Sequence, residues 1–183
     1  MGLRYATVVL GAVILASATA LSSTVVEPQR AGAATTTVET CGGGSITLKA
    51  REKRILVLHN RTRANHSLKP LCVNPRLTRA ARSHSREMIK KDYFSHDSYD
   101  GEGTGARLRR FGYDWSVYGE NIAGGSGTSG EPHPIFELWM NDAAHKANIL
   151  DGRFRQVGVG AYTGNYKGTG GCTMYTVDFG SRR

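Results

Sequence analysis

Residues 119–123, Gly-Glu-Asn-Ile-Ala, and residues 139–150, Trp-Met-Asn-Asp-Ala-Ala-His-Lys-Ala-Asn-Ile-Leu, form the most informative part of this sequence. A third phrase, Phe94-Ser95-His96, precedes them. Histidine and carboxylate side chains are the usual components of zinc sites and of general acid and base catalysis. All three phrases lie among glycine turns and helical signals, so we expect their histidines and acids to belong to one folded site.

The segments around these phrases predict an α+β fold. Apolar spacing and capping residues predict helices at residues 47–65, 75–91, 104–111 and 135–148. The second helix has the best start signal, because Asn74 is a favoured N-cap and Pro75 suits the first helical position. Alternating apolar residues predict strands at 119–123, 156–163 and 172–179. The predicted helices come mostly before the predicted strands along the chain, and this order favours a sandwich with an antiparallel core sheet.

The N-terminal residues predict export. Arg4, an apolar run at 8–15 and the small residues Ala18-Thr19-Ala20 have the pattern of a signal peptide at 1–20, with an alternative cleavage site after Ala31-Gly32-Ala33. The apolar run is too short for a membrane anchor. Residues 21–40, rich in Ala, Thr and Ser, are expected to be a flexible leader, so the domain is placed at 41–183. We expect a secreted, extracellular, monomeric protein.

The chain is basic, with a formal net charge of +9. A basic exported protein is expected to stay near anionic wall polymers or membrane surfaces. The clearest basic feature is a stripe on the second predicted helix, made of Arg79, Arg82, Arg86 and Lys90. No aromatic residues are interleaved with these cations, which argues against nucleic acid as the partner.

The sequence has three cysteines, Cys41, Cys72 and Cys172, and export would place them in an oxidising compartment. One disulfide and one thiol are the simplest arrangement, and the three pairings stay open. Cys41 with Cys72 encloses the shortest loop, while Cys172 lies in a strand pattern typical of a buried thiol.

The candidate site follows from the spacing of the histidines and acids. Asp142 and His145 are three residues apart on a predicted helix, so both side chains can share a metal or a proton. His96 and Glu120 are the other candidates, and Glu137 competes with Asp142 as the second acid. Two imidazoles with nearby carboxylates predict a metal site, with His96 and His145 as ligands of zinc.

Several motifs in order resemble the CAP superfamily of cysteine-rich secretory, venom antigen and pathogenesis-related proteins, in its bacterial branch. They are Leu58–Arg63, Phe94–His96, Gly119–Ala123, Trp139–Asn141, His145–Leu150, Val157–Gly160 and Tyr175–Gly180. The resemblance implies a single-domain α-β-α sandwich. It also implies a cleft with two histidines and two acids, here His96, Glu120, Asp142 or Glu137, and His145.

Two classes of function remain open. The first is a non-enzymatic module that binds a divalent metal or a small hydrophobic ligand such as a lipid, sterol or wall component. The second is a metal-dependent, protease-like hydrolase in which Glu120 is the general base. We favour binding, because the sequence has no third firm metal ligand and no nucleophile beside the histidines.

Overall fold

The computed structural model describes residues 34–182. The expected signal peptide, both cleavage sites and most of the expected leader therefore lie outside the described residues. Within residues 34–182, no helix is long and apolar enough to cross a membrane.

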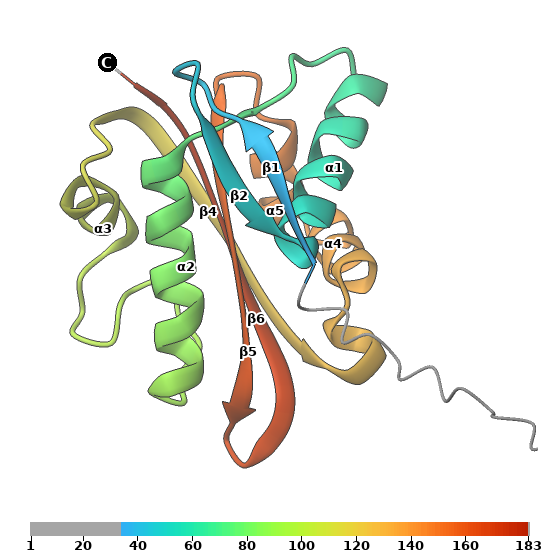
Figure 1. Cartoon of the computed structure of the whole chain (residues 1–183), viewed down its shortest axis with the longest axis vertical. Helices are drawn as coiled ribbons and strands as arrows, with labels where there is room; N and C mark the ends of the chain where they lie inside the picture. Colours follow the sequence, from blue (N-terminus) through green and yellow to red (C-terminus); the bar gives the residue numbers. More distant parts are fainter. Residues whose placement is uncertain (1–33, 183) are drawn as a thin grey trace, which may run out of the picture.

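A four-stranded sheet forms the centre of the molecule (Figure 1). Its strands, in spatial order, are β3 (Cys72–Val73), β5 (Gln156–Tyr166), β6 (Thr169–Arg182) and β4 (Trp115–Ser126). β3 is parallel to β5, while β5, β6 and β4 pair antiparallel. The mainly antiparallel sheet predicted from the sequence is confirmed, and β4 forms one of its edges.

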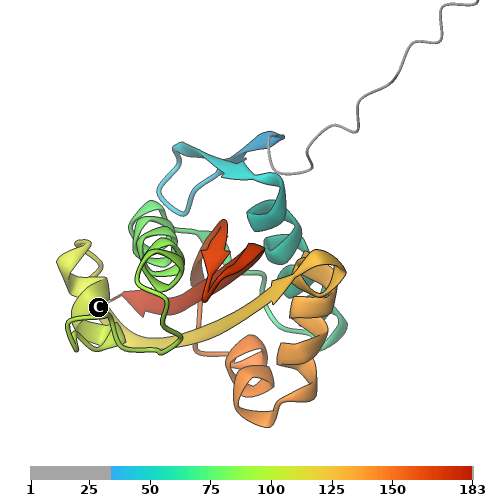
Figure 2. The same cartoon turned by 90° about the horizontal axis from the view of Figure 1, so that it is seen from below.

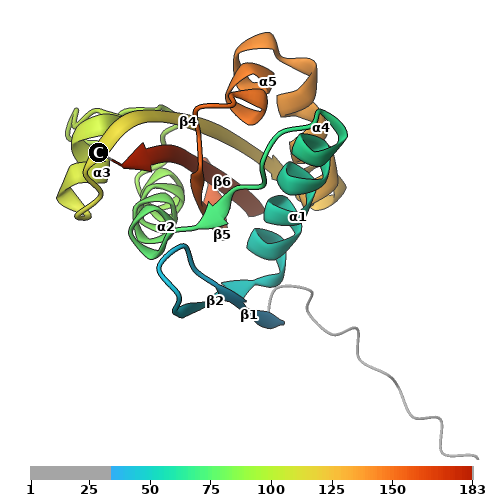
Figure 3. The same cartoon turned by 90° about the horizontal axis from the view of Figure 1, so that it is seen from above.

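Helices cover both faces of the sheet (Figures 2 and 3). One face carries α2 (Pro75–Lys90) and α3 (Thr104–Arg110); the other carries α1 (Ala50–Asn65), α4 (Pro132–Asn141) and α5 (Ala143–Leu150). Trp139 and Ile135 of α4 are fully buried in the larger apolar core, together with Val177 and Phe179 of β6. This arrangement is the α-β-α sandwich that the resemblance implied.

Close packing of α2 on β5 explains the Val157–Gly160 motif. A Cβ atom at Gly158 would lie 2.1 Å from the carbonyl carbon of Leu77, and one at Gly160 would lie 2.3 Å from that of Ala81. Glycine is needed at both positions because the helix backbone occupies the space of a side chain. As predicted, α2 begins at Asn74, whose side chain accepts hydrogen bonds from the N–H groups of Arg76 and Leu77.

The start of the domain was placed too late. Residues 35–39, assigned to the leader, form β1 (Thr35–Glu39), which pairs with β2 (Ser45–Lys49) as an antiparallel hairpin. The predicted first helix therefore begins at Ala50 instead of residue 47. A bridge between Thr40 and Val73 and the disulfide between Cys41 and Cys72 attach the hairpin to β3. Backbone pairing lets this polar segment fold without an apolar core of its own.

The predicted helix at 135–148 was also wrong as a single element. It is two helices, because Asp142 has an extended backbone that ends α4 and caps α5. Leu138 of α4 is 56% exposed, whereas its neighbour Trp139 is fully buried. The strand predicted at 119–123 is longer, because Gly124 and Gly125 lie within β4, and Gly127–Gly130 forms a short 3₁₀ turn.

Candidate functional site

Glu120 is a buried carboxylate on the edge strand β4. Its side chain is 3% exposed and points to the sheet face that carries α2 and α3. Oε1 accepts hydrogen bonds from His96 Nδ1 at 2.8 Å and from Thr104 Oγ1 at 3.1 Å, while Oε2 is bound by Arg107. Both carboxylate oxygens are therefore already engaged by protein groups.

His96 lies in the segment after α2 and presents its ring to solvent. Because the carboxylate can only accept, the Nδ1–H of His96 donates to Glu120. The hydrogen bond to Glu120 outweighs the effect of burial and raises the pKa of His96 above its ordinary value. The side chain is 52% exposed, and none of the described contacts engages its Nε2 atom. His96 thus offers its Nε2 atom to solvent, while its Nδ1 atom is held by Glu120.

Arg107 of α3 holds the acidic side of the site together. It is fully buried and donates to the carbonyl of His96 at 3.0 Å, to Ser98 Oγ at 3.0 Å and to Glu120. Burial alone would raise the pKa of Glu120, but the hydrogen bond from His96 and the charge of Arg107 outweigh it and hold that pKa below its usual range. Glu120 is consequently an ionised anchor.

Asp178 is a second buried acid directly beside Glu120. It lies opposite Glu120 in the antiparallel pair of β4 and β6, so both side chains share one face of the sheet. Asp178 is fully buried, and neither of its oxygens has a hydrogen-bond partner within normal geometry among the described residues. Burial, followed by the negative charge of Glu120, raises the pKa of Asp178 well above its usual range. Its surroundings therefore favour the protonated, neutral form of Asp178.

His145 and Asp142 form a second pair on the other side of β4. Asp142 caps α5 by accepting from the N–H groups of Ala144 and His145 at 3.0 and 2.9 Å. Its Oδ1 atom also lies 3.0 Å from Nδ1 of His145, whose side chain is 28% exposed. The backbone hydrogen bond from His145 is the main cause of the lowered pKa of Asp142. Asp142 and His145 are therefore in contact, but through a helix cap and not through the shared helix face that the sequence predicted.

Asn121 and Asn148 connect the two pairs. Asn121, next to Glu120, donates to the carbonyl of His145 at 3.0 Å. Asn148 of α5 donates to the Asn121 side chain at 2.9 Å and to the carbonyl of Glu120 at 3.2 Å. A Cβ atom at Gly119 would lie 2.9 Å from Asn148 Oδ1, which explains the glycine before Glu120. The two pairs are thus fixed to adjacent residues of one edge strand.

Glu137, the competitor of Asp142, is placed elsewhere. It is exposed on α4, and its carboxylate lies 3.8 Å from Nε2 of His133. The predicted helix at 135–148 would have held residues 137 and 145 in one continuous element. The break at Asp142 removes that relationship.

The residues at this site do not fit a closed zinc site. Across residues 34–182, no group of three or more His, Cys, Asp or Glu side chains is arranged to hold a metal. Glu120 is bound by Arg107, and Asp142 caps a helix, so His96 and His145 would be the only side-chain ligands. Structural zinc sites have four protein ligands and catalytic sites have three.

Sequence reasoning missed Arg107 and Asp178. Arg107 was one of several basic residues on a short helix, and its partner Glu120 is on another element. Asp178 did carry a signal, because it is an acid in a strand whose neighbours Val177 and Phe179 are apolar. A carboxyl inside a buried strand needs a partner or a proton, and this requirement could have identified it.

Comparisons with known proteins agree with this architecture. The model of the family described as CAP, cysteine-rich secretory protein family, matches residues 56–179. The chain is 36% identical over 113 residues to the uncharacterized protein YkwD of Bacillus subtilis, which covers 62% of this chain and 43% of that protein. It is 33% identical over 119 residues to the uncharacterized membrane protein YlbC of the same organism, covering 63% and 34%. The chain therefore spans less than half the length of these two relatives.

Two solved structures share the fold. An extracellular protein containing an SCP domain from Bacillus anthracis superposes with a TM-score of 0.63 at 26% identity, covering 77% of this chain and 47% of that chain. An outer surface protein from Borrelia burgdorferi superposes with a TM-score of 0.62 at 17% identity, covering 82% of this chain and the whole of that chain. The second similarity concerns the fold alone.

Proposed function

The chain belongs to the cysteine-rich secretory protein (CAP) family, and on that premise we propose that it is an exported, non-enzymatic binding module. Its ligand-binding groups are His96, which Glu120 holds, and His145, on the two sides of the edge strand β4. Export is supported by the N-terminal signal pattern and by the extracellular or surface description of two structural relatives.

The main support for this proposal is that protein groups already bind both carboxylate oxygens of Glu120. A general base needs a carboxylate oxygen that can reach water or substrate and a pKa near the working pH. Glu120 is 3% exposed, its two oxygens already accept from His96, Thr104 and Arg107, and its pKa is lowered. These contacts suit a residue that positions His96 and are unfavourable for a base.

The groups that remain for a ligand are the two imidazoles. His96 presents Nε2 to solvent from an anchored ring, and its raised pKa favours the protonated, donating form in weakly acidic surroundings. Phe94, two residues before His96, is 50% exposed. A ligand with an anionic or oxygen-rich group next to an apolar part, such as a lipid or a wall component, matches this combination.

A binding assay with matched histidine variants tests the proposal. His96→Ala and His145→Ala should each weaken retention of the protein on purified wall fragments or phospholipid vesicles about tenfold, since a charge-assisted hydrogen bond contributes roughly 1.5–3 kcal/mol. His133→Ala is the control, because His133 is an exposed histidine of α4 that pairs with Glu137. Equal retention of all four proteins would refute the proposed site.

The alternative, a metal-dependent hydrolase, makes different demands. It requires His96 and His145 to bind zinc together and Glu120 to act as base. Calorimetric titration with zinc and peptide hydrolysis by the zinc-loaded protein test it directly. Tight zinc binding that both histidine variants abolish, with hydrolysis lost in Glu120→Gln, would favour the enzyme over the binding module.

A further inference from the structure

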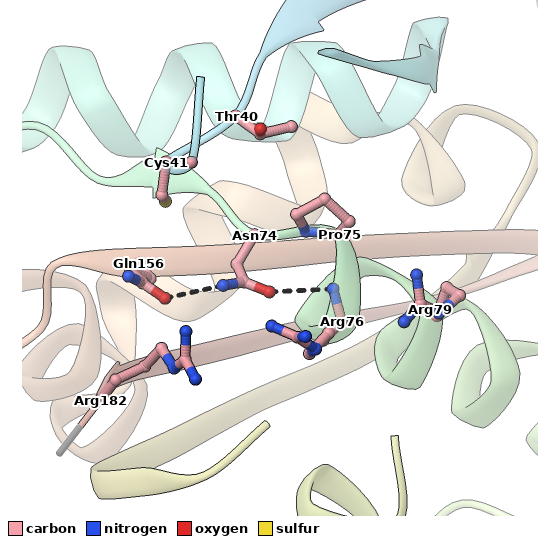
Figure 4. A pocket seen from close by; sticks show the side chains of 9 residues that line it. Thr40, Cys41, Asn74, Pro75, Arg76, Arg79, Gln156 and Arg182 are labelled. Carbon is pink, nitrogen blue, oxygen red and sulfur yellow. Dashed lines mark hydrogen bonds between the residues drawn. The ribbon is translucent and has the colours of Figure 1, made fainter. Parts of the chain in front are cut away.

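A cationic pocket lies at the end of the sheet where β5 begins and β6 ends, and none of its lining residues belongs to the histidine site (Figure 4). It has a volume of about 390 Å³ and lies where the hairpin turn after β1, the first turns of α2, the start of β5 and the end of β6 meet. Arg76, Arg79, Arg182, Asn74, Gln156 and Cys41 are among its lining residues. Proteins commonly bind small ligands in cavities of about this size.

Three guanidinium groups line this pocket, and no acidic residue does. Arg76 and Arg79 are one turn apart on α2, while Arg182 comes from the last described residues of β6. Among the contacts of residues 34–182, none of these three arginines forms an ion pair or a side-chain hydrogen bond within the protein. By contrast, several arginines elsewhere in the described residues are paired, such as Arg51 with Glu131, Arg82 with Glu52 and Arg110 with Glu102.

The polar floor of the pocket is held in place. Asn74 donates to Gln156 Oε1 at 2.8 Å and accepts from the N–H of Arg76 at 2.9 Å (Figure 4). The Asn74 side chain thus occupies the free N–H groups at the start of α2, so the helix backbone is not the source of the positive charge. The disulfide between Cys41 and Cys72 fixes the wall formed by the hairpin turn. The arginines themselves supply the binding groups.

We propose that this pocket binds a phosphate group of a small phosphorylated molecule. Three like charges close together repel each other, and an anion placed among them removes that cost. Guanidinium groups form paired hydrogen bonds with phosphate oxygens. A phosphate monoester carries nearly two negative charges, so it matches three arginines better than a single carboxylate does. The pocket exceeds the size of one phosphate and leaves room for the group that carries it.

Titration with two defined probes tests this site. Calorimetry with inorganic phosphate and with glycerol 3-phosphate should detect binding to the wild type at low ionic strength and weaker binding in added chloride. Arg76→Gln and Arg182→Gln should each weaken binding at least about tenfold, because each removes one charge-assisted contact. Arg86→Gln is the matched control, since Arg86 is an exposed arginine of the same helix outside the pocket. Melting temperatures of the variants would verify that each is folded.

The titration results distinguish a phosphate pocket from a basic surface that binds membranes. The proposal would be overturned if Arg76→Gln and Arg182→Gln left the binding of both probes unchanged. It would also be overturned if Arg86→Gln weakened binding as much as these two variants do. Binding to vesicles of phosphatidylglycerol and phosphatidylcholine without binding of either soluble probe would also overturn it, in favour of a membrane surface. His96→Ala should leave phosphate binding unchanged, so failure here is distinguishable from failure of the histidine site.

Discussion

Glu120 and Asp178 are adjacent buried carboxyls whose pKa values are shifted in opposite directions. They face each other across β4 and β6. Arg107 and His96 stabilise the charge of Glu120, whereas burial and the charge of Glu120 raise the pKa of Asp178. Two carboxylates this close cannot both ionise without a large cost. Glu120 therefore positions His96. Asp178 fills the buried space next to Glu120, and its raised pKa limits the negative charge that it adds.

The raised pKa of Asp178 predicts tolerance of Asp178→Asn. The variant should retain or gain stability at neutral pH, because an amide of the same shape cannot ionise when buried. The raised folded pKa means that the wild type gains stability as pH falls through that pKa towards the unfolded value of 3.8, and Asp178→Asn should lack this gain. Denaturant unfolding across pH measures both effects. A large loss at neutral pH would mean that Asp178 is ionised.

His59 predicts acid sensitivity of the fold. It is fully buried against Phe136, Trp139 and Phe179, and burial lowers its pKa from 6.5 to about 4. The neutral ring contributes its full stability above pH 6.5, and this contribution is lost as pH falls from there through 4. At pH 5 the loss is about 2 kcal/mol relative to pH 7. His59→Gln cannot titrate, so its unfolding free energy should change less over this range; equal changes would contradict the assignment.

Trp139 is predicted to be a major stabilising residue. It is fully buried, and its indole N–H donates to the carbonyl of Ile122 at 3.0 Å. Trp139→Ala should cost about 3–5 kcal/mol, from lost packing and the cavity left behind. Denaturant unfolding measures this, with Leu138→Ala as an exposed neighbour that should have little effect. A cost for Trp139→Ala below about 1 kcal/mol would show that the site collapses around the cavity.

The basic stripe on α2 is not a uniform surface feature. Arg82 donates to both oxygens of Glu52, at 2.8 and 2.6 Å, and the Glu52 side chain is fully buried. Arg82→Ala should therefore cost roughly 1.5–3 kcal/mol, because it leaves a buried carboxylate without its cation. Arg86→Ala removes the same charge from an exposed position and should change stability by about 0.5 kcal/mol or less. Equal melting temperatures for the two variants would contradict the role of Arg82.

The disulfide is predicted to stabilise the hairpin and the domain. Cys41 and Cys72 are 31 residues apart, and linking them restricts the unfolded chain. The double variant Cys41→Ala with Cys72→Ala should lose about 2–4 kcal/mol in unfolding free energy. Thiol labelling of the unfolded wild type should detect one thiol, from the buried Cys172. Labelling of all three cysteines would show that the bond is absent.

Much of the fold could be predicted from local sequence. Asn74 and Pro75 located the start of α2 because an N-cap and a proline act within one turn. The strand pattern at 172–179 located β6, since alternation depends only on neighbouring residues. Local rules failed at Asp142, where a helix ends and another begins within an apolar pattern that looks continuous. They also failed at 35–39, where a polar strand depends on its hairpin partner.

The candidate site could likewise be predicted only in part from the sequence. By itself, the sequence determined the family, the order of the elements and the identities of His96, Glu120 and His145, because each lies in a short phrase with its own pattern. Only the tertiary structure decided their chemical state. Glu120 is a bound anion, the pKa of Asp178 is raised, and Arg76 is one of three arginines that line one pocket, because distant segments bring these groups together. Protonation and charge pairing depend on burial and on neighbours in space, which no local pattern records.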